Sequence, residues 1–382
     1  MKLNKVIGII TASVLILGCA ACSKPASTGA ENKEPEKVEE VKEIPTFNVG
    51  WSNELHTGNM ELAFLRPEAF EGNSVHLKPV SDTQLELVKD GETIAYINKI
   101  LTKGAAECAT LLSQGHMDIA FCSSTAMLTS YDTGTDVNIL CPVQSGGVAV
   151  VAAADVPYNT FEELVEYAKS SDTPIVGGYH SAISSPRIVL EYALKEAGLT
   201  VTEDSANYDA DVLLIDLKGL SNLVPALSSG QVELWAGPMP NPQNAEKQGV
   251  GKIIATLDEL PGGKWVDFPC CTLNVMEPIK DAYPEEIQAF VEATKDIMDY
   301  AQTNREDTAA ALTEYVGLDE ETLKKNNTTY SITPDEHFKN GMSVYFEAMT
   351  GMGKFSDRLA GKTFEEVENT VFDFSFAENA SK

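Results

Sequence analysis

Positively charged side chains are scarce in this chain of 382 residues. Lysine and arginine together number 28, against 57 aspartates and glutamates, and the formal net charge is −29. Binding to nucleic acid needs a basic surface that neutralises phosphates, and adhesion to anionic lipid headgroups needs one as well. The composition therefore excludes a nucleic-acid partner and any electrostatic adhesion to a membrane.

Arginine is especially rare, with only four residues: Arg66, Arg187, Arg305 and Arg358. A two-pronged clamp on a carboxylate or sulfonate usually uses arginine. Only Arg187, at the start of a predicted helix that follows His180, is placed to approach a cleft. An anionic ligand would therefore depend on helix N-termini, hydroxyls and histidine, whereas a neutral or heteroaromatic ligand would suit the aromatic loops at least as well.

Signatures of known catalytic sites are absent after residue 46. The sequence has no Gly-x-Ser-x-Gly, no phosphate-binding loop with lysine, no His-Glu-x-x-His and no Cys-x-x-Cys there. We therefore predict that the protein is not an enzyme, and that it has no catalytic residues, no cofactor and no metal site.

Cysteines are few and odd in number beyond residue 46: Cys108, Cys122, Cys141, Cys270 and Cys271. An odd number excludes a complete disulfide framework within one chain. The run Pro269-Cys270-Cys271 begins a predicted strand, in which neighbouring side chains point to opposite faces. A buried structural role is the expected one for this pair, although one thiol of the two could face a cleft.

An apolar run from Val6 to Leu17 follows Lys2 and Lys5. It is too short for a membrane-spanning helix, which needs about 20 apolar residues, and it has the form of a secretory signal. The sequence Leu15 to Cys19 resembles a bacterial lipobox. The resemblance implies a signal peptide over 1–18 and a palmitate-bearing lipid on Cys19, with Cys22 as the second candidate and an ordinary cleaved signal as the alternative.

Residues 19–46 differ in composition from the rest of the chain, since they are rich in Pro, Ser, Lys and Glu. Such a segment cannot bury enough apolar surface to order itself. We predict a disordered tether that lets the domain reach a partner on the same membrane.

From Phe47 onward, short apolar strands alternate with amphipathic helices, and Asp90-Gly91 marks a tight hairpin. This alternation predicts an α/β fold with mainly parallel sheets that helices cover on both faces. The chain after residue 46 is longer than a single core usually requires, which predicts two lobes.

Two segments share one pattern, in which a helix ends at glycine and a strand follows: Leu111 to Phe121 and Val224 to Gly237. Between them lie the hydroxyl-rich turn His180 to Ser185 and a helix that ends at Gly198-Leu199. Together these motifs resemble the substrate-binding proteins of ABC importers for nitrate, sulfonates, taurine and thiamine-pyrimidine precursors. Met239 stands where that group usually has a glutamate.

The resemblance implies the type II periplasmic-binding-protein fold, with two lobes joined by two hinge strands. The first lobe would comprise residues 47–146 and 280–382, and the second residues 147–279, with crossings near Gly146–Val148 and near Pro278. The implied function is that of a monomeric, lipid-anchored receptor on the extracytoplasmic face of the cell membrane, which captures a small solute and delivers it to an ABC permease and its ATPase. The alternatives are a pyrimidine-synthase-like enzyme that uses His180 or Cys270 and Cys271, and a sensor domain for a membrane signalling partner.

Ligands of open α/β sheets bind at the carboxyl ends of strands, beside helix N-termini. This rule and the resemblance select loop residues with hydroxyl, imidazole or aromatic side chains. The hydroxyls have helix capping as an alternative role, and the aromatic residues can pack against the hinge instead of stacking on a ligand. The predicted ligand-binding residues are Trp51, Ser52, His56, Ser123, Ser124, Thr125, Ser145, Tyr179, His180, Ser181 and Met239.

Overall fold

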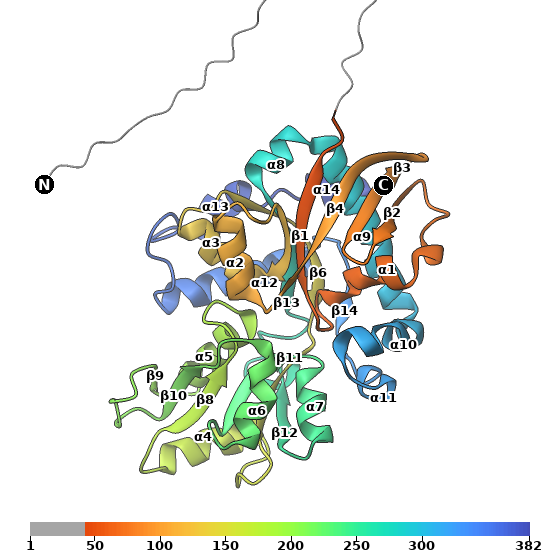
Figure 1. The fold of residues 1–382 in the computed structure, drawn as a ribbon. Coiled ribbons are helices and arrows are strands. Elements are labelled where there is room, and N and C mark those ends of the chain that lie inside the picture. Colours follow the sequence, from red (N-terminus) through yellow and green to blue (C-terminus); the bar gives the residue numbers. More distant parts are fainter. Residues whose placement is uncertain (1–42) are drawn as a thin grey trace, which may run out of the picture. The chain divides into compact units, whose positions relative to one another are not determined.

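The structure, a computed structural model, describes residues 43–382 (Figure 1). The signal segment, both candidate lipidation sites (Cys19 and Cys22) and nearly all of the tether lie outside the described residues. Within residues 43–382, no helix is both long enough and apolar enough to cross a membrane.

Eight strands form the first sheet, and both ends of the domain contribute to it (Figure 1). In sheet order they are β14 (Thr329–Tyr330), β6 (Val137–Ser145), β13 (Pro269–Met276), β5 (Ile119–Ser123), β1 (Thr46–Ser52), β4 (Glu92–Thr102), β3 (Gln84–Lys89) and β2 (Val75–Ser81). The two parallel pairs lie at the centre, where β1 runs beside β4 and β5. The other five pairs are antiparallel, so this sheet is mixed and not mainly parallel as predicted.

Six strands form the second sheet. In sheet order they are β12 (Gly251–Thr256), β7 (Val148–Ala153), β11 (Leu234–Pro238), β8 (Ile175–Tyr179), β10 (Val212–Asp216) and β9 (Val201–Thr202). The pairs from β11 to β9 are parallel, whereas β7 runs antiparallel to both of its neighbours.

The chain passes from the first sheet to the second at Gly146–Gly147, between β6 and β7. It returns between β12 and β13, which is earlier than the expected crossing near Pro278. The reason is that Pro269–Met276 pairs with β5 and β6 of the first sheet. Residues 269–279 therefore belong with the first sheet and not with the second.

The helices lie around both sheets. Those from residues outside 148–256 are α1 (Leu62–Leu65), α2 (Ala105–Ser113), α3 (Ser124–Asp132), α8 (Glu277–Ala282), α9 (Pro284–Thr303), α10 (Arg305–Val316), α11 (Glu320–Leu323), α12 (Glu336–Gly351), α13 (Phe364–Val371) and α14 (Ser375–Ala380). Those between β7 and β12 are α4 (Phe161–Ser170), α5 (Ser185–Glu196), α6 (Leu223–Ser228) and α7 (Asn241–Lys247). Short 3₁₀ turns are η1 (Gly58–Glu61), η2 (Pro67–Ala69), η3 (Leu220–Asn222) and η4 (Leu257–Glu259).

The predicted hairpin at Asp90-Gly91 is confirmed. Both residues have positive φ, 51° for Asp90 and 85° for Gly91, as a two-residue turn between antiparallel strands requires. The hairpin makes β3 antiparallel to β4 at one side of the first sheet.

Candidate functional site

A small cavity of about 40 Å³ lies where loops from the two sheets meet, on the order of a few water molecules in size. Strand ends of the first sheet supply one part of its wall, and the loop after β8, the start of α5 and the end of β11 supply another. Its wall is unusually rich in groups that bind metals or carry protons: His56, His180, Glu54, Cys108, Cys122, Cys270 and Cys271.

The loop after β1 is held by the buried carboxylate of Glu54. This carboxylate accepts hydrogen bonds from the backbone N–H groups of His56 and Thr57 and, at 2.6 Å, from the Thr57 hydroxyl. The Thr57 hydroxyl in turn accepts the N–H of Ser52 at 3.1 Å. Burial raises the pKa of Glu54, although the neighbouring His56 and these hydrogen bonds oppose the shift. The loop therefore presents the His56 imidazole in one fixed position.

His56 is buried, and its Nε2 lies 2.7 Å from the carbonyl oxygen of Gly147. A carbonyl only accepts hydrogen bonds, so Nε2 carries the proton. Burial lowers the pKa of His56, but the negative charge and hydrogen bond of Cys270, the charge of Glu54 and the Gly147 carbonyl outweigh burial and raise it to about 9.

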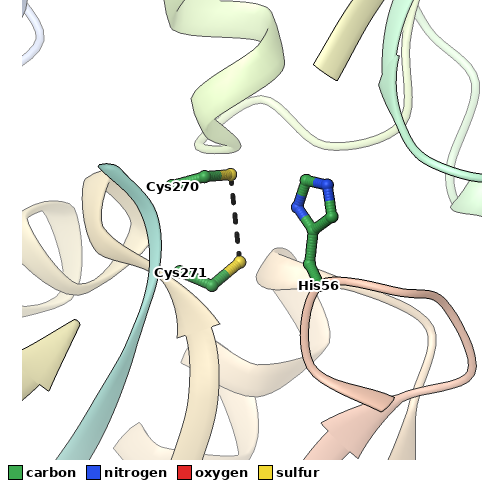
Figure 2. Close-up of side chains that lie close together, drawn as sticks. All are labelled: His56, Cys270 and Cys271. Carbon is green, nitrogen blue, oxygen red and sulfur yellow. Dashed lines mark hydrogen bonds between the residues drawn. The ribbon is translucent and has the colours of Figure 1, made fainter. Parts of the chain in front are cut away.

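Cys270 and Cys271 begin β13 at an irregularity of the ladder. Pro269 pairs with Ser145 and Cys271 with Gln144, so Cys270 is the extra residue of a bulge. The two sulfur atoms lie 3.9 Å apart, and Figure 2 shows both thiols and the His56 ring directed toward one another. The hydrogen bond from Cys271 and the charge and hydrogen bond of His56 lower the pKa of Cys270, against the effect of burial.

His180 follows β8 and is also buried. Within residues 43–382, its Nδ1 atom has no hydrogen-bond partner. Burial lowers its pKa to about 4, and the positive charge of His56 adds to the effect. A neutral imidazole with an unpartnered buried nitrogen is therefore available to a ligand in the cavity.

Four of the predicted ligand-binding residues line this cavity: Ser52, His56, Ser123 and His180. They come from three separate segments of the chain, because Ser52 and His56 share the end of β1 and the loop after it. Ser123 is the N-cap residue of α3, but its side chain makes no capping hydrogen bond. That hydroxyl lies 3.5 Å from the Thr125 hydroxyl of α3 instead of capping the helix backbone.

The predicted aromatic residues have partners within the protein instead. Trp51 is fully buried, and its Nε1 donates to Glu61 at 3.3 Å. The Tyr179 hydroxyl donates to Glu203 at 2.6 Å, and its ring lies beside the Arg187 guanidinium. Neither ring belongs to the cavity wall.

The remaining predicted residues lie near the cavity without lining it. The Thr125 hydroxyl donates to the Ile183 carbonyl at 2.8 Å, Ser124 is fully buried, and Ser181 lines a separate hollow beside His180. Ser145 lines a different hollow at the end of β6. Met239 is buried and joins backbone hydrogen bonds with Gly147 and Leu55. A role for these residues in ligand contact stays a prediction.

Arg187 does not approach the cavity as expected. Its guanidinium is buried and lies 3.0 Å from Glu191 and 2.8 Å from Glu203. Because these carboxylates pair with the Arg187 guanidinium, it is not free to bind an anionic ligand. The cavity wall therefore holds no arginine.

The sequence interpretation missed several residues of the wall, namely Glu54, Thr57, Cys108 and Cys122, and assigned Cys270 and Cys271 mainly to structure. The rule that we applied considers only the carboxyl ends of strands. Because β13 is antiparallel to β5, its first residues lie at the same sheet edge, with Cys271 opposite Ser123. Cys270 and Cys271 were missed because the sequence does not reveal that β13 runs antiparallel to β5.

Known proteins resemble this chain in sequence and in structure. Residues 89–317 match the sequence model of the NMT1-like family. An uncharacterized protein of Methanocaldococcus jannaschii is 28% identical over 104 residues, which are 26% of this chain and 72% of the relative.

Solved structures share the fold at low identity. A ligand-binding component of an ABC-type import system from Staphylococcus aureus, solved with zinc bound, has a TM-score of 0.66 at 15% identity and covers 88% of this chain and 99% of its own. The periplasmic nitrate-binding protein NrtA from Synechocystis has a TM-score of 0.66 at 15% identity, and the match covers 89% of each chain. The aliphatic sulphonate binding protein SsuA from Escherichia coli has a TM-score of 0.59 at 14% identity. The match covers 87% of this chain and 99% of SsuA. The predicted periplasmic-binding-protein fold and the motif resemblance are confirmed.

Proposed function

The chain belongs to the NMT1-like family, and from this we propose that it is the solute-binding component of an ABC importer. In this proposal a small solute enters between the two sheets, and the closed protein delivers it to a permease. The solved relatives named for nitrate and sulphonate binding support a binding role rather than an enzymatic one.

The observation that carries the proposal is the composition of the cavity wall. Ser52 and Ser123 end strands of the first sheet and His56 follows β1, whereas Pro238 ends β11 of the second sheet and His180 follows β8. A ligand that contacts both groups stabilises the closed arrangement, because it has more contacts there than in an open one. The free energy that drives closure comes from the additional contacts that the ligand makes in the closed arrangement.

The solute proposed here is a small neutral or singly charged molecule from the nitrate, sulfonate, taurine and pyrimidine-precursor class. Hydroxyls, imidazoles and backbone groups are available to it, but no guanidinium is. His180 supplies the polar contact with the clearest geometry, because its buried Nδ1 has no partner among the described residues.

A thermal-unfolding screen of the purified protein tests the proposal. The panel comprises nitrate, bicarbonate, taurine, alkylsulfonates and hydroxymethylpyrimidine. A solute at 100 times its Kd should stabilise the protein by about 2.7 kcal/mol. His180→Ala should abolish the shift, whereas His76→Ala, which changes a histidine on β2, should leave it intact. Cooperative unfolding with no shift for any compound would overturn this solute class.

We also propose that Cys19 carries the lipid anchor on the extracytoplasmic face of the membrane. The lipobox-like sequence Leu15 to Cys19 supports this assignment. Labelling of cells with a palmitate analogue should mark the protein, and Cys19→Ser should abolish the label and release the protein from the membrane fraction. If Cys22→Ser has that effect instead, the anchor belongs to Cys22.

A further inference from the structure

We propose that the cavity binds a thiophilic metal ion of the Zn²⁺ type through Nδ1 of His56 and the sulfur atoms of Cys270 and Cys271. The proposal rests on the proposed function in so far as it names a ligand of the same cavity. It does not require that any particular organic solute is transported.

The three side chains already have the spacing of a coordination site. One ligand atom from each lies within 4.8 Å of the others, and all three residues are buried. Two thiolates bound to Zn²⁺ at about 2.3 Å in tetrahedral geometry are roughly 3.8 Å apart. The two sulfurs here are separated by 3.9 Å, so an ion would need almost no change in their separation.

The hydrogen bonds of His56 select the ligand atom. Since Nε2 donates its proton to the Gly147 carbonyl, Nδ1 is the nitrogen that faces the sulfurs (Figure 2). Metal-binding histidines almost always donate their second ring N–H to a carbonyl or carboxylate, which fixes the ring and raises its basicity. The Gly147 carbonyl therefore has the position of this supporting partner.

The bulge at the start of β13 explains how adjacent cysteines serve one ion. In a regular strand their side chains would point to opposite faces. The register shifts between Pro269 and Cys271 and again between Cys271 and Thr272, and such bulges redirect side chains, often next to functional sites. Both sulfurs consequently face His56 (Figure 2).

The donor set also determines the class of ion. Two sulfurs and an imidazole suit Zn²⁺ and similar borderline or soft ions, whereas Mg²⁺ and Ca²⁺ require oxygen ligands. Two thiolates and one divalent cation are neutral together, which removes the cost of burying unpaired charge.

Three protein ligands leave one position of a tetrahedral ion open. Cys122, Ser123 and His180 line the same cavity, so the open position faces the space where a solute or water would lie. Structural zinc sites have four protein ligands, whereas sites that exchange a ligand keep one position free. The geometry therefore fits an ion that holds a solute rather than one that only holds the fold together.

The test uses the reduced, chelator-treated protein and titrates it with Zn²⁺ in competition with a chromophoric chelator. Co²⁺ serves as the spectroscopic probe. We expect one equivalent of Zn²⁺ and, with Co²⁺, a sulfur-to-metal charge-transfer band and tetrahedral d–d bands. Cys270→Ala, Cys271→Ala and His56→Gln should each weaken Zn²⁺ binding at least tenfold. His56→Gln keeps a donor toward Gly147 while it removes the Nδ1 ligand.

Cys141→Ala is the matched control, because Cys141 is buried in the first sheet and is not part of the cavity wall. Its Zn²⁺ affinity should stay within twofold of the unchanged protein. The proposal is overturned if Co²⁺ gives no charge-transfer band, if less than a tenth of an equivalent of Zn²⁺ binds, or if Cys141→Ala weakens binding as much as Cys270→Ala. Zinc binding without any solute shift would contradict only the solute class, and a solute shift in protein that binds no metal would contradict only the metal site.

Discussion

The carbonyl of Gly147 accepts a 2.7 Å hydrogen bond from Nε2 of His56. The same carbonyl accepts the backbone N–H of Met239 at 2.8 Å, and the Met239 carbonyl accepts the N–H of Leu55 at 3.3 Å. These bonds join the loop after β1 to the link between the sheets and to the end of β11. The orientation of the imidazole is therefore tied to the backbone that connects the two sheets.

Gly147→Ala should destabilise the protein and disturb His56. Gly147 has φ of +66°, and a Cβ there would lie 2.1 Å from the Thr328 hydroxyl and 2.9 Å from Nε2 of His56. The left-handed backbone costs about 1–2 kcal/mol for other residues, and overpacking adds about 1–3 kcal/mol. Urea unfolding should show a loss of about 2–5 kcal/mol, and Zn²⁺ affinity should fall by about tenfold.

Gly146→Ala separates the cost of the left-handed backbone from the cost of the steric clash with His56 and Thr328. Gly146 has the same φ of +66°, but its Cβ would meet only the Asn327 carbonyl, at 3.8 Å. We expect the backbone cost alone, about 1–2 kcal/mol, with unchanged Zn²⁺ affinity. Equal losses of affinity in the two variants would show that His56 is not positioned by Gly147.

The local elements of the fold could be predicted because they depend on local chemistry. Asp90-Gly91 alone determined the hairpin, and the alternation of strands and helices was sufficient for the fold class. The direction of β13 could not be predicted from the sequence, because an apolar strand has the same residue pattern whether it runs parallel or antiparallel to its neighbours. The second crossing was consequently placed near Pro278, and Cys270 and Cys271 were assigned mainly to structure.

The strand pattern also contained information about Trp51 that we did not use. Residues at alternate positions of a strand share one face, and Phe47, Val49 and Trp51 are all buried in the core. Ser52 lies on the opposite face, where it lines the cavity. The position of Trp51 at the end of β1 suggested a ligand contact, whereas its periodicity indicated the core. The positions of the loop residues, in contrast, depend on contacts between distant segments.

Trp51→Phe should therefore change stability rather than binding. The indole is fully buried and donates to Glu61, so its loss removes packing and one hydrogen bond, for about 1–3 kcal/mol. Lys99 still pairs with Glu61 at 2.8 Å, which limits the cost. Solute affinity, measured by calorimetry with a compound from the screen, should stay within twofold. A large loss of affinity at unchanged stability would restore the stacking role.

A buried cluster of charges on α5 provides a separate test of stability. Glu191 is 5% exposed and accepts a hydrogen bond from Lys195 at 2.7 Å. It also lies 3.0 Å from Arg187 and 2.9 Å from Lys354 of the segment after α12. Removal of one partner from a buried cluster leaves the others uncompensated, so Glu191→Gln should cost about 3 kcal/mol near neutral pH. Urea unfolding of the variant and the unchanged protein measures this difference.

The cost of Glu191→Gln should depend on pH. Burial raises the pKa of Glu191, but the hydrogen bond from Lys195 and the charges of Arg187 and Lys354 outweigh it, so the pKa is lowered from the ordinary 4.5. The stabilisation is complete above that value and is lost as the pH falls through the lowered pKa of Glu191, so the two proteins should converge in stability at acidic pH. Glu320→Gln, which removes an exposed partner of Lys324, should change stability far less than Glu191→Gln, because solvent screens an exposed ion pair. A constant difference between the proteins at neutral and acidic pH would mean that the carboxylate charge does not stabilise α5.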